Sequence, residues 1–272
     1  MALNRDNFII DRYVKGNGYL PATGERIYSL DQVKDGNLKV TVENSVDVVD
    51  AIGNKIETLE RGRSAEFSAS NALFSFTLMG EQLGAATTEA TDSAAINMPK
   101  WEEFTLTGNE TEVTLKEIPV GTAGAEIPFI YVVPKAGGVS KQFKIAAEAG
   151  ADAFKLEAAT KKLTLPTGLN VGDKVCVDYE YACKKGFKMT SSAIDKVREH
   201  KAVFLVLGHD ACDKNTQYAA YQVFPKAKLS PEIDLTFTPD MDHPFTLQCA
   251  QDYCDPQKRL FEILVDENGY VA

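Results

Sequence analysis

The chain has 272 residues and a formal net charge of −10, and 44% of its residues are hydrophobic. Length and composition predict one large or two modest globular domains, and no apolar run is long enough for a membrane helix. The acidic balance argues against a nucleic-acid-binding protein, because phosphate contacts need a basic surface. The opening MALNRDNFII lacks the unbroken apolar core of a signal peptide, so we expect the protein to be made and kept in a cytosol.

The charge is unevenly distributed along the chain. Residues 98–188 contain twelve Lys, no Arg and twelve acidic residues, so this stretch is neutral. The flanks hold the remaining 17 basic and 27 acidic residues and therefore carry the whole net charge. The pattern predicts an inserted domain at 98–188 within a discontinuous acidic host domain at 1–97 and 189–272.

In the first host segment, period-two alternation predicts a strand at 37–43. Residues 55–59 and 65–67 are shorter candidate strands, separated by the turn-prone Gly62. In the strand at 37–43, Leu38, Val40 and Val42 form the half-buried face. From Ser70 the apolar residues recur at helical spacing as far as Leu83, which predicts a helix. Ser70 or Asn71 is expected to cap its first turn, and Gly84 suits the position just after its end.

Residues 85–97 have the small, polar composition of a linker, and many short strands follow. They are predicted at 102–106, 112–116, 128–133, 142–145, 162–165 and 174–182, with glycine-containing turns between them. About seven short strands in a stretch of this length are typical of a small Ig-like β-sandwich.

The host resumes near Gly186. A short helical turn is predicted at 194–200, followed by strands at 202–207, 221–230, 233–238, 245–250 and 260–265. The alternation is strictest at 233–238, where Ile233, Leu235 and Phe237 are expected to face the core.

The residues do not indicate an enzyme, a cofactor site or a metal site. His209, Cys212, Cys249 and Cys254 lack the spacing of a zinc site, and five scattered cysteines in a reducing compartment are expected to be free thiols. His209 and Cys212 have no orienting partner that would make a catalytic pair. The glycine-containing segments 120–124 and 135–138 lack phosphate-loop spacing, and Asp240 with Asp242 lack EF-hand spacing.

The order of the parts resembles the tail tube (major tail) proteins of long-tailed bacteriophages. A β-rich segment ends in a helix, an optional β-domain follows, and the chain closes with FPKAKLSPEIDLTFTPDMDHPFTLQCAQDY and LFEILVDE. The resemblance implies a mainly β fold, namely a tail-tube-like β-sandwich or barrel with one flanking helix, plus the inserted Ig-like β-sandwich. It also implies a virion structural protein, made in the host cytoplasm, whose hexameric rings stack into a tube for DNA passage.

The resemblance implies several partners: further copies of the chain, the tape-measure, baseplate and sheath proteins, and DNA in transient, non-specific passage. An acidic lining would repel that DNA. If the strand at 233–238 lines the channel, Asp234, Thr236 and Thr238 face the lumen. Two alternatives stay open: another virion component, such as a tube terminator, neck, baseplate or decoration protein, and a surface- or carbohydrate-binding β-sandwich module.

Overall fold

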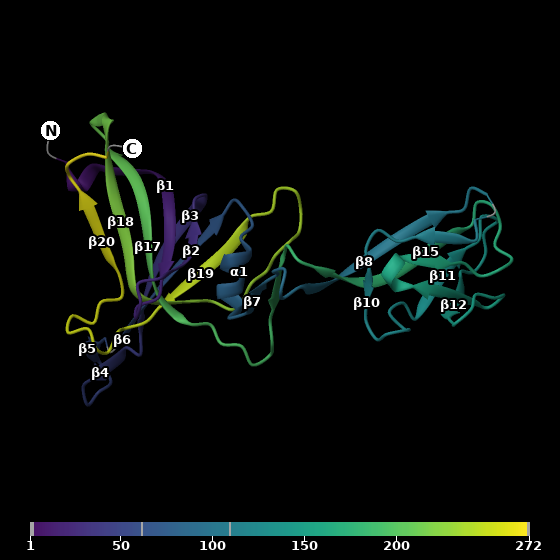
Figure 1. Ribbon diagram of the computed structural model, residues 1–272. Coiled ribbons are helices and arrows are strands. Elements are labelled where there is room, and N and C mark those ends of the chain that lie inside the picture. Colours follow the sequence, from purple (N-terminus) through teal and green to yellow (C-terminus); the bar gives the residue numbers. More distant parts are fainter. Residues whose placement is uncertain (1–2, 61, 109, 271–272) are drawn as a thin grey trace. The chain divides into compact units, whose positions relative to one another are not determined.

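The chain folds into two compact units, Met1–Ala86 with Met189–Ala272, and Thr87–Lys188. We call them the host unit and the insert unit. The computed structural model describes residues 3–60, 62–108 and 110–270 (Figure 1). Where the chain passes between the units, β7 (Ala86–Glu89) and β16 (Phe187–Thr190) pair as a two-stranded sheet.

The host unit is built on one strongly curved sheet. Its strand order is β2-β1-β17-β18-β19-β6-β3, and β20 pairs with β18 beside β19. The strands are β1 (Phe8–Tyr19), β2 (Arg26–Leu30), β3 (Val33–Glu43), β6 (Gly62–Asn71), β17 (Glu199–Asp210), β18 (Asp213–Leu229), β19 (His243–Cys249) and β20 (Glu262–Asp266). A short 3₁₀ turn, η1 (Arg5–Asn7), precedes β1. A separate hairpin is formed by β4 (Val46–Val49) and β5 (Lys55–Leu59).

Irregular registers curl this sheet into a nearly closed barrel. β1 shifts register against β17 after Ile10 and again after Tyr13, and β-bulges of this kind increase the local twist. β3 shifts between Lys34 and Asn37, and Gly36 lies in that gap. A Cβ atom at Gly36 would lie 2.1 Å from the Tyr13 hydroxyl oxygen, so only glycine allows Tyr13 of β1 to pack on β3. The mainly β, barrel-like host with a flanking helix is as predicted.

Aromatic side chains fill the barrel. The Phe67 ring lies 4.8 Å from the Phe204 ring and 5.2 Å from the Phe224 ring, between centroids. Phe204 also stacks on Phe245, with centroids 6.0 Å apart. These four rings are buried and come from β6, β17, β18 and β19, so the core joins the strands that the sheet order places at its centre.

The helix α1 (Phe76–Leu83) lies beside β19 (Figure 1). The buried residue His243 of β19 joins the two elements by hydrogen bonds. The Ser75 backbone N–H donates to His243 Nδ1 at 3.2 Å, and His243 Nε2 bonds Gln82 Oε1 at 2.7 Å. Because Nδ1 accepts, the proton of the neutral ring is on Nε2. Burial lowers the pKa of His243, so the neutral ring is favoured.

Within the described residues, no helix is long and apolar enough to cross a membrane.

Two local predictions in the host unit are wrong. The helix begins at Phe76 with Ser75 as its N-cap, because Ser70 and Asn71 are paired with β19 as the end of β6. Residues 194–198 form no helical turn, and Glu199 starts β17. The predicted end of the helix is confirmed, since Gly84 is its C-cap with φ of 63°.

The predicted strand at 233–238 is also absent, and these residues form an irregular connection. The register explains why, because Leu229 of β18 lies opposite Leu247 of β19 and the connection between them loops out of the ladder. An alternating sequence becomes a strand only where its backbone finds a partner. Ile233 and Leu235 are half-buried, whereas Phe237 is 76% exposed rather than in the core.

The insert unit has its own sheet and its own hydrophobic core. The strands are β8 (Ile96–Thr105), β9 (Glu112–Thr114), β10 (Pro119–Val120), β11 (Phe129–Val133), β12 (Lys141–Ile145), β13 (Ala153–Glu157), β14 (Lys162–Thr164) and β15 (Lys174–Cys183), with a 3₁₀ turn η2 (Ala158–Thr160). Their order is β10-β15-β11-β12-β13-β14-β9, with β8 on β15. The core centres on Phe154, Ile130 and Val177, all fully buried. Sequence reasoning missed β10, which has only two residues, and β13, although Phe154 and Leu156 alternate with polar residues there.

Candidate assembly surface

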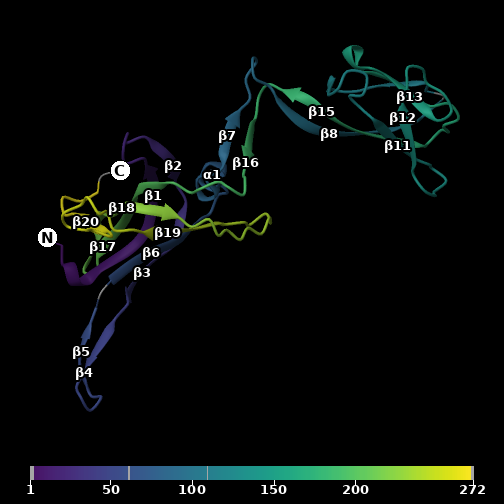
Figure 2. The same ribbon diagram turned by 90° about the horizontal axis from the view of Figure 1, so that it is seen from below.

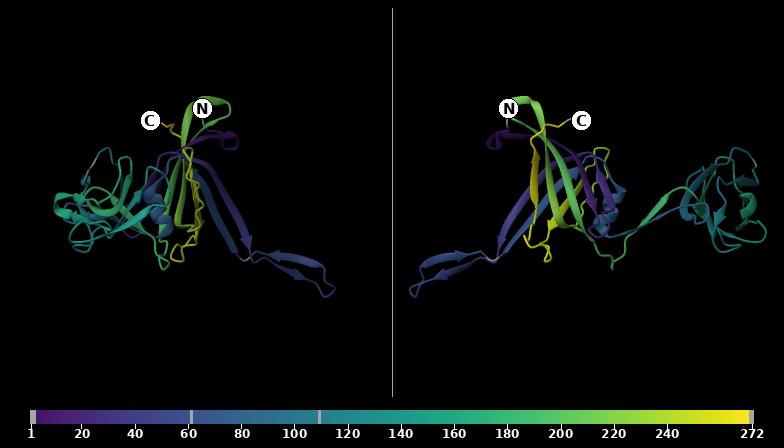
Figure 3. Two further views of the ribbon diagram at one scale, coloured as in Figure 1. Left: turned by 90° about the vertical axis from the view of Figure 1, so that its right-hand side faces the viewer. Right: turned by 60° about the vertical axis from the view of Figure 1, so that its left-hand side comes forward.

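The β4–β5 hairpin projects beyond the ends of β3 and β6 (Figures 2 and 3). It is held together by its own polar residues. Asp50 Oδ1 accepts the backbone N–H groups of Ile52 and Asn54 at 2.9 and 2.8 Å, which closes the turn. Asp47 accepts from Thr58 Oγ1 at 2.7 Å and from Lys55 Nζ at 2.9 Å. These bonds lower the pKa of Asp47, with that from Thr58 the largest cause.

The apolar side chains of this hairpin are exposed. They are Val46, Val48, Val49, Ile52, Ile56 and Leu59, with Ile52 exposed by 87% and Ile56 by 68%. A two-stranded hairpin without a hydrophobic face to pack on is at best marginally stable in water. Exposed apolar residues gathered on such an element indicate a surface that another chain covers.

The neighbouring end of β3 continues this apolar surface. Leu38 packs against the host core, but Val40 is 48% exposed and Val42 is 41% exposed. The prediction that all three share a half-buried face is therefore correct only for Leu38. The physical reason is that β3 runs beyond the barrel, so its outer half has no core beneath it.

The host sheet also has two unpaired edges on opposite sides of its β2-β1-β17-β18-β20 portion. In the described part of the chain, β2 pairs only with β1 and β20 pairs only with β18. Each strand therefore presents a row of backbone N–H and C=O groups that lack a ladder partner. In β20 the consecutive residues Ile263, Leu264 and Val265 are all exposed, so this edge is apolar on both faces.

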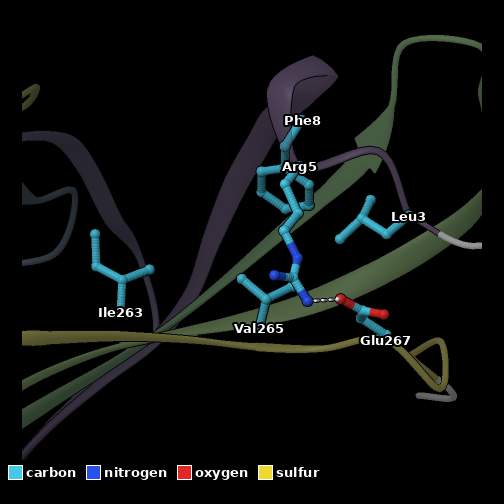
Figure 4. Close-up of a pocket in the computed structure, with 6 residues that line it drawn as sticks. All are labelled: Leu3, Arg5, Phe8, Ile263, Val265 and Glu267. Carbon is cyan, nitrogen blue, oxygen red and sulfur yellow. Dashed lines mark hydrogen bonds and ion pairs between the residues drawn. The ribbon is translucent and has the colours of Figure 1, made fainter.

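A groove lies between β20 and the N-terminal segment (Figure 4). It has a volume of about 410 Å³ and is lined by Leu3, Arg5, Phe8, Ile263, Val265 and Glu267. Arg5 Nη2 and Glu267 Oε1 form an ion pair at 3.2 Å across it, and both side chains are well exposed. The groove is open and mostly apolar, which suits packing against another protein surface better than catalysis.

The three predicted lumen-facing residues lie in the connection between β18 and β19. Asp234, Thr236 and Thr238 are all exposed, and none of them belongs to a sheet. These three residues are near one another only because they are close in the sequence of one loop. Their place in a channel therefore stays a prediction, and the strand that suggested it is absent.

The cysteines and the histidine considered for zinc binding differ in burial. Cys249 is buried in the host core, where burial raises the pKa of its thiol to about 12. Cys212 and Cys254 are exposed, and His209 is half-buried. Among the described residues, no group of three or more His, Cys, Asp and Glu side chains is arranged to hold a metal ion.

Sequence reasoning identified β5 but missed the hairpin as a functional element. The signal was present: the turn-forming residues 50–54 separate the Val-rich run 46–49 from the run 55–59, which contains Ile56 and Leu59. The free edges carried no comparable signal, because edge position depends on the order of strands in the sheet.

Comparison with known proteins identifies the family of the chain. A model of the YomU/Tube protein family matches residues 17–258, which is most of the chain. The chain belongs to this family of phage-associated, tube-type proteins. A comparison with curated proteins found no match.

Proposed function

We propose that this chain is the structural subunit of a phage tail tube, forming hexameric rings that stack around a channel for DNA. The family supports a tube-related structural protein of the virion. The observation that carries the subunit role is the combination of a free sheet edge on each side of the host and a projecting apolar hairpin. A self-assembling tube needs contacts within a ring and contacts between rings, and these two features supply both.

The contact within a ring joins β20 of one copy to β2 of the next. Such a contact is head-to-tail, and it closes into a ring when the rotation between copies divides a full turn. Leu30 of β2 and Ile263 of β20 lie on one row of the sheet, through Gly16, Phe204 and Gln222. From that row the two strands extend mainly in opposite directions. Joining them therefore staggers neighbouring copies, as a closed barrel requires.

The contact between rings uses the β4–β5 hairpin. Its apolar residues would be buried against the next ring, which gives this two-stranded element the packing partner that it otherwise lacks. Because the hairpin projects from the barrel, one copy can reach a neighbour along the tube axis. Ring formation and ring stacking then depend on different residues, so a mutation can disrupt one of them without the other.

The net charge fits a channel that DNA passes without binding. All of the −10 charge belongs to the residues outside 98–188. Like charges on the lining and on the phosphates disfavour contacts that would slow transit.

Negative-stain microscopy of the purified chain at increasing concentration tests the proposal. Six-fold rings and tubes are expected. Replacement of Ile263 and Val265 by Lys should prevent rings while leaving a folded monomer, because both residues lie on the exposed edge strand. The matched control is Val139→Lys, which adds the same side chain at an 88% exposed position of the insert unit. A dispersed monomer at every concentration, or normal rings from the β20 variant, would contradict the proposal.

A further inference from the structure

The insert unit presents an exposed aromatic surface that the tube contacts do not use. Trp101 in β8 is 79% exposed, which is unusual for the largest apolar side chain. It lies directly opposite Asp178 of β15 in the ladder. On the next strand, the inward-facing Ile130 pairs with Val177, so Phe129 and Asp178 lie one position beyond that pair on the outward face. The outward surface therefore runs from Trp101 across Asp178 to Phe129.

A shallow groove of about 340 Å³ lies beside Trp101. Its apolar wall includes Pro99, Pro128 and the indole ring. Its charged lining is entirely acidic: Glu126, Asp178 and Glu180. The insert as a whole is neutral over residues 98–188, so this concentration of negative charge beside an aromatic ring is local.

The basic residues of the same strands do not neutralise the groove. Lys100 is adjacent to Trp101 and so lies on the opposite face of β8, where it pairs with Glu117 at 3.4 Å. Lys174 pairs with Glu103 at 3.7 Å. In the described part of the insert, no ion pair involves a groove carboxylate, although Glu180 accepts a hydrogen bond from Asn97 Nδ2 at 3.2 Å. The carboxylates are thus available to an incoming cation.

We propose that this groove docks a basic segment of a protein partner, with a Lys or Arg side chain lying over the Trp101 ring. A cation within about 6 Å of an indole face is attracted by the negative charge of the π system. Asp178 and Glu126 add charge-assisted hydrogen bonds. Phe129 and the exposed Tyr131 of β11 offer apolar surface to the residues that follow the cation. Charge complementarity selects this partner over an acidic or neutral one.

The test uses the full chain and does not require assembly, so it can fail without affecting the tube proposal. Trp101 is the only tryptophan of the sequence, and its fluorescence therefore reports on the groove alone. Tetralysine amide should change its emission saturably, and raising the salt concentration should weaken the effect. Tetraglutamate and maltotetraose, tested at the same concentrations, should leave the emission unchanged.

Matched variants separate the groove from general charge effects. Asp178→Asn should weaken tetralysine binding about threefold, and adding Glu126→Gln should bring the loss to about tenfold, as exposed ion pairs allow. The control Asp152→Asn removes one exposed carboxylate outside the groove and should leave the affinity unchanged. Equal losses in the control and in Asp178→Asn would overturn the proposal. A salt-independent response to maltotetraose without one to tetralysine would overturn it in favour of a carbohydrate ligand.

Discussion

Replacing Ile52 and Ile56 by Ser removes the two most exposed apolar side chains of the β4–β5 hairpin. Complete burial of an Ile side chain contributes about 1.5–3 kcal/mol. Since Ile52 is 87% exposed and Ile56 is 68% exposed, docking of the hairpin can bury most of both side chains. The double variant should then lose roughly 2–5 kcal/mol per stacking contact, which raises the dissociation constant roughly 30-fold to several-thousand-fold.

The expected result is rings without tubes. Sedimentation velocity and negative-stain microscopy over a concentration series measure the shift. The thermal midpoint of the unassembled chain should stay nearly unchanged, because both residues already face solvent there. Val139→Ser, at an 88% exposed position of the insert unit, is the control and should assemble normally. Tubes of normal length from the double variant at the wild-type threshold concentration would refute the assignment of the hairpin to stacking.

Three further predictions concern the folded chain. Gly84→Ala should destabilise the host more than Gly124→Ala destabilises the insert: both positions have positive φ, but only at Gly84 would the new Cβ lie within 2.5 Å of a backbone oxygen. Chemical denaturation measures both losses, and equal values would contradict the close approach. Because burial lowers the pKa of His243, host stability should fall as the pH drops below about 6.5, where the unfolded state takes up a proton that the folded state resists. A His243→Asn variant should show a weaker pH dependence in thermal unfolding, and an unchanged slope would argue against this residue. Tyr179→Phe removes the hydroxyl that donates to the buried carboxylate of Glu102, so it should cost about 1–3 kcal/mol and lower only the calorimetric transition of the insert unit. A single shifted transition for the whole chain would show that the two units unfold together.

Local sequence patterns determined most of the strands and one end of the helix. Period-two alternation places side chains on opposite faces, so segments such as 37–43 and 245–250 were recognisable without knowledge of their partners. Gly84 was recognisable for a similar reason, because the left-handed C-cap conformation favours glycine whatever surrounds it. The difference between neutral and acidic stretches likewise distinguishes residues 98–188 from their flanks, because charge composition depends on the amino-acid sequence alone.

The tertiary structure decided which patterns became ladders and which apolar faces stayed exposed. Residues 233–238 alternate more strictly than any other segment, yet they form a loop because β18 and β19 pair with each other across them. Val40 and Val42 occupy alternating apolar positions like those of the core strands, yet they face solvent because no core lies beneath them. Alternation specifies that one face of a strand is apolar, but only the order of strands determines whether that face meets the core of its own chain or stays exposed.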